Sequence, residues 1–474
     1  MRQPSLASLA LFLFLLLHVV PEEVSGQFWA REGAKEKGDH EEVVHGGDDE
    51  NSQKIHLPVV KLSNDNTIPL VGLGVGNLQH YVVPLMVAGA IQDDKRTRLI
   101  DTSHISDNEH LVAEGIQEGM ERVLGGNDRI VTIHVVTKVW YTYLGYERTK
   151  LSIRESFQAL KSAMDHPRVD LKVHILLHWP RCYDNISWMS CQEDEARTPH
   201  HIKAAGPPPH QDKDAWKGSW KALEEAYLGD EFPIRSIGVA NFHLKDMEEL
   251  EELAQVQPHI LQLNVWSLLY DSQLIDYCYK HGIHVQVYSI LNGIVTEPQK
   301  APNAFHHLQK VASELTDDKQ PHSQQEQEED EVSPAQVVLA WLVQHGVSIV
   351  PRTSRLSRLK ENSAVALASV PDLSVEQVET VAHSVEAFLS EDDLEKDIHV
   401  KITFHATTKD TFLYWNTHDG GEIKVAFIPK GESFNEMTYP NHSFRLYDAR
   451  NKDHFIEYKV DAKFGSHEHV HAEL

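Results

Sequence analysis

The sequence predicts a (β/α)8 TIM barrel followed by a small all-β sandwich. Eight short, apolar, strand-like runs alternate with helical patterns over roughly 300 residues, the rhythm of an α/β barrel. These runs lie at Val71 and at residues 99–100, 130–136, 173–177, 234–239, 260–263, 284–288 and 347–350. A doubly wound open sheet is the alternative, although no G-x-G-x-x-G follows a strand, which counts against a Rossmann unit. After residue 390, short strand-like runs separated by turn-rich segments predict the sandwich.

These patterns divide the chain into four segments. We expect a signal peptide at residues 1–26, a disordered acidic linker at 27–54, the barrel at 55–390 and the sandwich at 396–474. The 474 residues suffice for two or three domains. Asp and Glu number 71 against 44 Lys and Arg, so the composition argues against nucleic-acid binding through a basic face.

The N-terminus has the pattern of a secretory signal. Arg2 precedes an apolar run at residues 6–20, and small residues before Gly26 suit cleavage after that glycine. An uncleaved signal anchor is the alternative, but the run is short for a membrane span of about 20 residues. No later stretch is long and apolar enough to span a membrane, so the mature protein is expected to lack one.

Other features are consistent with a secretory route. Glycosylation sequons begin at Asn185 and Asn441, and Cys182 and Cys191 lie in one loop where they could form a disulfide. The last four residues, His-Ala-Glu-Leu, resemble an endoplasmic-reticulum retrieval signal of the H-D-E-L type, with Ala472 as the departure. The lumen of that compartment and secretion both remain open.

The barrel segment opens with an expected hairpin, in which residues 59–62 and 67–70 are the two strands. Helical patterns follow at residues 151–164, 216–228 and 335–344. Residues 181–214 interrupt the alternation after a strand. Because loops that follow strands build the active-site rim of a barrel, this segment is a candidate lid.

A carboxylate at the end of a strand carries the main functional motif. Residues 98–109 read R-L-I-D-T-S-H-I-S-D-N-E and resemble the D-T-A-x-x-Y-x-N-E motif of the aldo-keto reductases. The match includes Asp101, and Ser106 stands at the tyrosine position. Lys138 and His178 each end a further strand-like run, where barrel enzymes place catalytic groups. The resemblance covers residues 56–385.

The resemblance implies hydride transfer from a nicotinamide to the carbonyl carbon of a small aldehyde or ketone. In that family a tyrosine is the acid, the lysine lowers its pKa, the aspartate fixes the lysine and the histidine orients the carbonyl. The Ser106 hydroxyl is a much weaker acid on a shorter arm, and losing a general acid costs about 100- to 10,000-fold in rate. Three outcomes are open: a substitute acid, a water held by Ser106 and Lys138, or cofactor binding without turnover. The candidate substitutes are His178, His104, Tyr141 and Tyr143.

The family's cofactor positions are also matched. Asn241 and Gln262 would bind the nicotinamide amide, with Ala240 replacing the family's serine, and Tyr288 would stack on the ring. Residues 351–362, P-R-T-S-R-L-S-R-L-K-E-N, resemble the family's P-K-S-x-x-x-x-R-I-x-E-N. There Arg352, Thr353 and Arg358 would hold a 2′-phosphate and Asn362 the adenine, which implies NADPH rather than NADH.

Trp140 and Trp179 follow Lys138 and His178, and they fit the aromatic walls of a substrate pocket. Ordinary core or rim packing is the alternative for each tryptophan. The loop at residues 181–214 would set the identity of the substrate.

The C-terminal segment resembles the β domain of the von Hippel–Lindau protein over residues 398–470. The matching positions are Tyr414-Trp415, Asp419-Gly420, Pro429-x-Gly431, Thr438-Tyr439, His442 and Asp448-Ala449. That domain recognises hydroxyproline in a peptide, and Trp415 and His442 fall at two of its pocket positions, with Thr438 and Phe444 in place of its Ser and Trp. A peptide-binding module and a purely structural sandwich are both open. No metal site is expected, since the alternating His467, His469 and His471 are interpreted as an exposed polar tail.

Overall fold

The computed structural model describes residues 57–123, 129–183, 186, 188–294, 296–318, 331–389, 400–416, 422–438, 443–460 and 467–473. The expected signal peptide and the expected linker at residues 27–54 lie outside these residues, as do Asn185, Asn441 and His442. Among the described residues, none of the helices combines the length and the apolar character that a membrane span requires.

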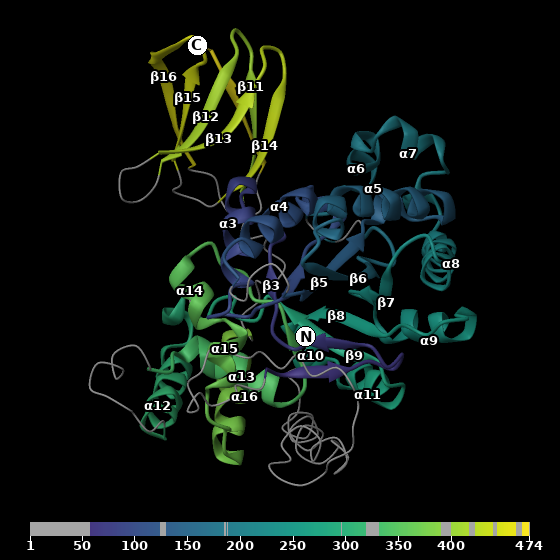
Figure 1. The fold of residues 1–474 in the computed structure, drawn as a ribbon, viewed down its shortest axis with the longest axis vertical. Coiled ribbons are helices and arrows are strands. Elements are labelled where there is room, and N and C mark those ends of the chain that lie inside the picture. Colours follow the sequence, from purple (N-terminus) through teal and green to yellow (C-terminus); the bar gives the residue numbers. More distant parts are fainter. Residues whose placement is uncertain are drawn as a thin grey trace.

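Eight parallel strands form the barrel (Figure 1), and each pairs with its neighbour in chain order. The strands are β3 (Leu73–Gly74), β4 (Leu99–Asp101), β5 (Val131–Val139), β6 (Val169–Leu177), β7 (Ile234–Ala240), β8 (Ile260–Asn264), β9 (His284–Tyr288) and β10 (Ser348–Ile349). Parallel bridges Val71–Ile349 and Gly74–Arg352 join the first strand to the last. Gly74 permits this closure, because a Cβ atom there would lie 2.7 Å from the Val350 oxygen. The predicted barrel is confirmed, and the open-sheet alternative is wrong.

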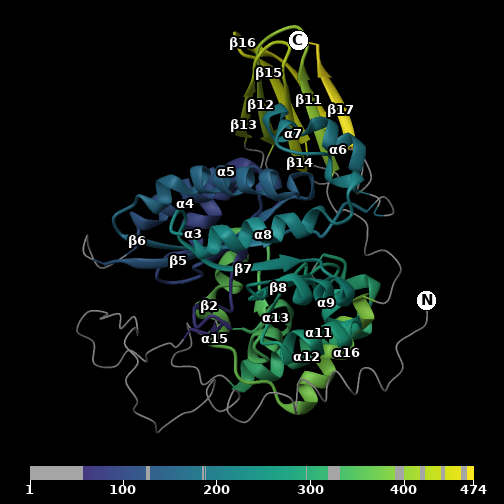
Figure 2. The same ribbon diagram turned by 90° about the vertical axis from the view of Figure 1, so that its right-hand side faces the viewer.

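Helices surround the barrel and follow its strands (Figure 2). They are α3 (Val83–Ala90), α4 (Glu109–Met120), α5 (Tyr146–Met164), α8 (Ala215–Leu228), α9 (Leu244–Leu253), α10 (Val265–Tyr270), α11 (Ser272–Lys280), α12 (Pro302–Asp318), α13 (Pro334–Gln344), α14 (Leu356–Glu361), α15 (Ala364–Ala368) and α16 (Val375–Leu389). Two short helices, α6 (Cys191–Arg197) and α7 (His200–Ala204), lie in the candidate lid. Apolar side chains between helices and strands form one continuous core.

A hairpin of β1 (Val59–Lys61) and β2 (Thr67–Pro69) closes the end of the barrel where the strands begin. Leu62 and Ile68 are buried against inward-facing barrel residues. These barrel residues are Leu99, Val136, Leu176, Ala240, Ile260 and Val350. The opposite end, where the carboxyl ends of the strands meet, is called the mouth below, and it is the end that carries function in this architecture.

The C-terminal domain is a two-sheet β-sandwich with a core of its own (Figures 1 and 2). One sheet has the order β14-β11-β17 and the other β13-β12-β15-β16. The strands are β11 (Val400–Ala406), β12 (Thr411–Asn416), β13 (Glu422–Ile428), β14 (Ser433–Thr438), β15 (Ser443–Asp448), β16 (Asn451–Lys459) and β17 (His467–Ala472). The histidine-rich end is therefore a strand rather than a loose tail, although His469 and His471 are exposed. Ala472 is buried and its carbonyl accepts a hydrogen bond from Thr407 at 2.7 Å.

Candidate active site at the barrel mouth

A buried ion pair lies at the mouth. Strands β4 and β5 are neighbours, and they deliver Asp101 and Lys138 to the same end of the sheet. Lys138 Nζ lies 2.6 Å from Asp101 Oδ1 and 2.7 Å from the Thr102 carbonyl oxygen. Gln262 from β8 donates to the same Asp101 oxygen at 2.7 Å. Lys138 is only 4% exposed, so the pair is held in a fixed place largely out of solvent.

His178, directly after β6, lies beside this pair. Its burial, with the positive charge of Lys138, holds the pKa of the imidazole well below its usual range. Nδ1 of His178 is buried and has no hydrogen-bond partner among the described residues. The Trp140 ring packs edge-on against His178, with centroids 5.0 Å apart. A neutral imidazole in this place can donate a hydrogen bond to a carbonyl oxygen without carrying a charge.

Ser106 ends the short 3₁₀ turn η2 (His104–Ser106) on the rim of the mouth. Its Oγ lies 2.7 Å from Ser103 Oγ, and a Cβ atom added at Gly76 would lie 3.5 Å from it. The Ser106 carbonyl faces His80 Nε2 at 3.3 Å. Ser106 thus lies between the β3–α3 loop and the end of β4, but its hydroxyl contacts another serine rather than Lys138 within the described contacts.

Three of the four candidate substitute acids are engaged in other contacts. The Tyr141 hydroxyl donates to Asp194, and burial raises its pKa. His104 Nε2 lies 2.8 Å from Glu155, and its ring packs 4.4 Å from that of Tyr143, whose pKa is also raised by burial. His178 is the candidate whose surroundings include Lys138.

The structure brings the expected nicotinamide residues together. The Tyr288 hydroxyl donates to Asn241 Oδ1 at 2.7 Å, and Asn241 Nδ2 donates to the His178 carbonyl at 3.0 Å. Asn241 adopts the left-handed conformation with φ 58°, which asparagine tolerates better than most residues. Gln262 donates to Gln286 at 2.7 Å. These side chains form two hydrogen-bonded groups, one that reaches the His178 carbonyl and one that reaches Asp101. A backbone bond from the Asn241 amide to the Gln262 carbonyl at 3.0 Å places the two groups side by side.

The expected phosphate and adenine residues lie together after β10. Arg352 Nη1 donates to the Gly76 carbonyl at 3.2 Å, and Thr353 Oγ1 accepts from the Arg355 amide at 3.1 Å. Arg358 lies in α14 and is half-buried, and Asn362 ends that helix. Because α14 packs against α3 and Arg352 bonds to Gly76, this segment lies beside the β3–α3 loop.

Residues 88–384, more than half of the chain, match the sequence family described as the aldo/keto reductase family. The chain belongs to the aldo/keto reductase family. One bacterial and one protozoan member show the extent of the likeness. This chain is 29% identical over 308 residues to the glyoxal reductase of Bacillus subtilis, and the alignment covers 65% of this chain and 86% of that protein. It is 29% identical over 305 residues to the 9,11-endoperoxide prostaglandin H2 reductase of Trypanosoma cruzi, covering 64% and 84%.

A solved aldo-keto reductase of Bombyx mori in complex with NADP shares the fold. The TM-score is 0.51 at 22% identity, and the alignment covers 70% of this chain and 94% of that one. The C-terminal sandwich extends beyond the matched family segment.

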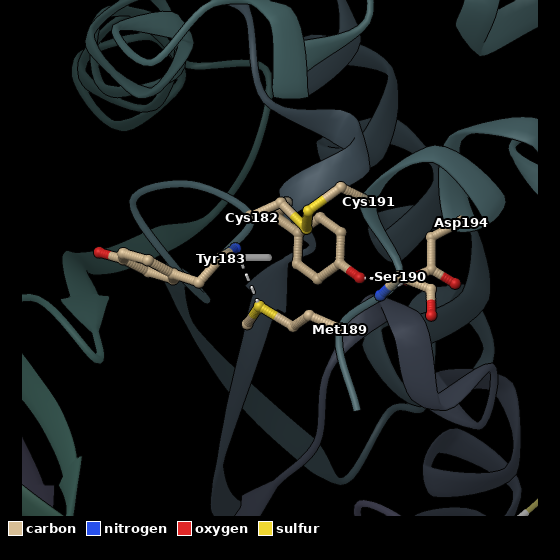
Figure 3. The surroundings of a disulfide bond; sticks show 7 residues. Cys182, Tyr183, Met189, Ser190, Cys191 and Asp194 are labelled. Atoms are coloured by element: carbon tan, nitrogen blue, oxygen red, sulfur yellow. Dashed lines mark hydrogen bonds between the residues drawn. A yellow bond between two sulfur atoms is a disulfide. The ribbon is translucent and has the colours of Figure 1, made fainter. Parts of the chain in front are cut away.

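This aldo/keto reductase also carries a disulfide that joins Cys182 and Cys191 (Figure 3), as the sequence predicted. The loop between them holds Trp188, which sequence reasoning missed. The Trp188 ring lies 6.2 Å from that of Trp140 and 5.6 Å from that of Trp179, so the two predicted pocket tryptophans share a third aromatic neighbour. The sequence feature that could have pointed to Trp188 is its position between two cysteines of one loop.

Two residues matched to the predicted peptide pocket of the sandwich lie in its core. Phe444 points into the core, fully buried and 5.2 Å from the Phe404 ring, and Thr438 is also fully buried. Trp415 packs on the core and faces Tyr81 of the barrel. Strand alternation turns Phe444 inward, and His442 lies outside the described residues. Peptide binding by the sandwich therefore stays a prediction.

Proposed function

We propose that this protein is an NADPH-dependent reductase of small carbonyl compounds. The observation that carries the proposal is the buried Asp101–Lys138 pair beside a neutral His178 at the mouth. NADPH, when bound, supplies the hydride. Asn241, Gln262 and Tyr288 offer amide groups and a flat ring for a nicotinamide.

The chain's own groups would handle the charge that develops on the carbonyl oxygen. Neutral His178 would donate a hydrogen bond to that oxygen and fix its position. Lys138 has three N–H donors, and the described contacts use two of them, on Asp101 and Thr102. The third can hold a water, together with the Ser106 hydroxyl, and this water would deliver the proton that the family's tyrosine delivers elsewhere.

A second candidate function is cofactor binding without turnover. It is favoured by Ser106, which stands where the family has its acid and whose hydroxyl contacts Ser103 at 2.7 Å. In this case the barrel would be an NADP(H)-dependent scaffold or recognition protein, and the buried ion pair would be structural.

Turnover distinguishes the two. NADPH oxidation would be followed with a panel of aldehydes and ketones, for the wild type and for Lys138→Met. The reductase proposal expects slow turnover that the substitution removes. Turnover that survives the substitution shows that the inherited machinery is not responsible, and no turnover with retained NADPH binding favours the second function.

The cofactor preference has a separate test. Arg352, Thr353 and Arg358 support NADPH over NADH, because a guanidinium group binds phosphate well. Fluorescence titration of both cofactors is expected to show that the wild type binds NADPH more tightly than NADH. Arg358→Ala is expected to reduce this difference in affinity. Equal affinities in the wild type contradict the arginine assignment.

We also propose that the protein works in the secretory pathway, in the endoplasmic-reticulum lumen or after secretion. The disulfide between Cys182 and Cys191 supports an oxidising compartment. Cell fractionation of the full chain tests the proposal, and recovery in the cytosol with free thiols at both positions contradicts it.

A further inference from the structure

We propose that Trp188 is a specificity-determining residue, and that the Cys182–Cys191 disulfide holds it over the mouth so that the pocket selects planar aromatic carbonyl compounds. The inference rests on the proposed function and names its substrate class. It starts from three tryptophans that come from two separate segments of the chain: Trp140 follows β5, whereas Trp179 and Trp188 follow β6.

These rings lead outward from the candidate catalytic group. Trp140 packs edge-on against His178 with centroids 5.0 Å apart. Trp188 then stacks on Trp140 at 6.2 Å and 28°, and it meets Trp179 edge-on at 5.6 Å. A ligand carbonyl held at His178 would therefore have its remaining atoms beside indole rings.

The loop that carries Trp188 is fastened on both sides of that residue. The disulfide joins its two ends, with Cα atoms 5.8 Å apart (Figure 3). Within the loop, the Tyr183 amide lies 3.3 Å from the buried Met189 sulfur. Closing a loop reduces the conformations that it can adopt, so the disulfide restricts the positions open to Trp188.

The helix after the loop is fastened as well. Cys191 begins α6, and Asp194 of that helix accepts the Tyr141 hydroxyl bond. Arg148 of α5 makes a two-pronged ion pair with Glu195, with both N–O distances 2.9 Å. The disulfide is thus one of several attachments that join the loop to the mouth.

The exposure of Trp188 indicates a role beyond packing. Trp188 is 37% exposed, whereas Trp140 is 8% exposed, so part of the Trp188 indole remains open to a ligand. Indole faces bind planar apolar groups by stacking and offer few hydrogen bonds. This chemistry favours aryl aldehydes and ketones over polyhydroxylated sugars or short aliphatic carbonyls.

The first test compares two probe substrates, 2-naphthaldehyde and propanal, in wild type, Trp188→Phe and Trp188→Ala. Trp188→Ala is expected to raise KM for 2-naphthaldehyde roughly tenfold, the size of a lost aromatic contact, with kcat and the propanal KM within about twofold. Trp188→Phe should retain most of the preference. Equal changes for both aldehydes, or none, overturn the inference. Tyr279→Ala, which removes an exposed aromatic ring from α11, is the control.

A binding measurement keeps the inference separate from catalysis. Calorimetric titration of 2-naphthalenemethanol into the NADP⁺-loaded protein is expected to be roughly tenfold weaker for Trp188→Ala. If no aldehyde is reduced by any variant, the proposed reductase function fails, yet this titration still reports on Trp188. Equal affinity in wild type and variant overturns the inference even when turnover is present.

The role of the Cys182–Cys191 disulfide has its own test. Cys182→Ser with Cys191→Ser should raise the 2-naphthaldehyde KM in the same direction as Trp188→Ala, and dithiothreitol should do the same to the wild type only. A reductant effect that persists in the double variant, or an unchanged KM in that variant, overturns the role of the disulfide.

Discussion

The rings of Tyr81 and Trp415 lie 6.1 Å apart, and they join the barrel to the C-terminal sandwich. Tyr81 belongs to the short turn η1 (His80–Val82) between β3 and α3, and Trp415 belongs to β12. A second pair, His80 and Phe434 of β14, lies edge-on at 6.5 Å. Since His80 also faces the Ser106 carbonyl at 3.3 Å, the sandwich touches a loop that borders the candidate site.

Loss of the Tyr81 ring should therefore loosen the sandwich from the barrel. Tyr81→Ala is expected to lower hydrogen-exchange protection in β12 by about 1 kcal/mol or more, the worth of an aromatic pair plus its buried area. Phe455→Ala, which removes an exposed ring from β16, should change protection by less than about 0.5 kcal/mol. Equal effects of the two substitutions would show that the Tyr81–Trp415 contact does not stabilise the domain.

Restoring the family's acid should speed the reaction. Ser106 is half-exposed at the rim, and Ser106→Tyr would place a phenol at the position that the family uses. We expect NADPH oxidation with an aldehyde to rise by roughly 100-fold or more, since a positioned general acid contributes about 100- to 10,000-fold. Ser106→Phe fills the same space without a hydroxyl proton to donate, so the rate of NADPH oxidation should not rise in this variant. An equal gain in both variants would assign the effect to packing rather than to acid catalysis.

Much of the candidate site could be predicted because strand order fixes it. Asp101, Lys138 and His178 each end a strand, and consecutive parallel strands place their carboxyl ends together, so the sequence motifs implied a common mouth. Trp188 could not be placed in this way, because its position depends on a disulfide-closed loop rather than on a strand. The inward turn of Phe444 could not be predicted, because a resemblance at single positions does not fix which face of a strand points to the core.

Acid should destabilise the barrel. His134 and His174 lie buried on the neighbouring strands β5 and β6, and His284 lies buried on β9. Burial lowers the pKa of His134 and of His284 to about 4, and the pKa of His174 well below 6.5. The unfolded chain therefore binds protons first, so this stability is complete above about pH 6.5 and declines as the pH falls towards 4. At pH 5 the loss is about 2 kcal/mol for His134 and for His284.

Urea unfolding of the barrel at pH 7 and pH 5 measures this loss. His284 Nε2 lies 2.7 Å from Ser348 Oγ, and His284→Gln keeps a polar partner for that hydroxyl while removing the titration. The substitution should flatten the pH dependence by about 2 kcal/mol. His383→Gln, at an exposed histidine of α16, should leave the slope as in the wild type. A slope unchanged by His284→Gln would contradict the assignment.

The sandwich should respond to pH in the opposite direction. Glu436 of β14 is 3% exposed, and its burial raises the pKa of the carboxyl to about 8. The folded state then holds a proton that the unfolded chain releases near pH 4.5, so stability is complete below that value and falls as the pH rises towards 8. The loss reaches about 4 kcal/mol at pH 8.

Hydrogen exchange of the β11 and β14 amides between pH 6 and pH 8, corrected for intrinsic exchange, measures this loss of stability. Glu436→Gln, which cannot ionise, should remove the loss. Glu457→Gln, at an exposed carboxyl of β16, should retain it. Protection that is constant over this range in the wild type would show that Glu436 ionises without cost.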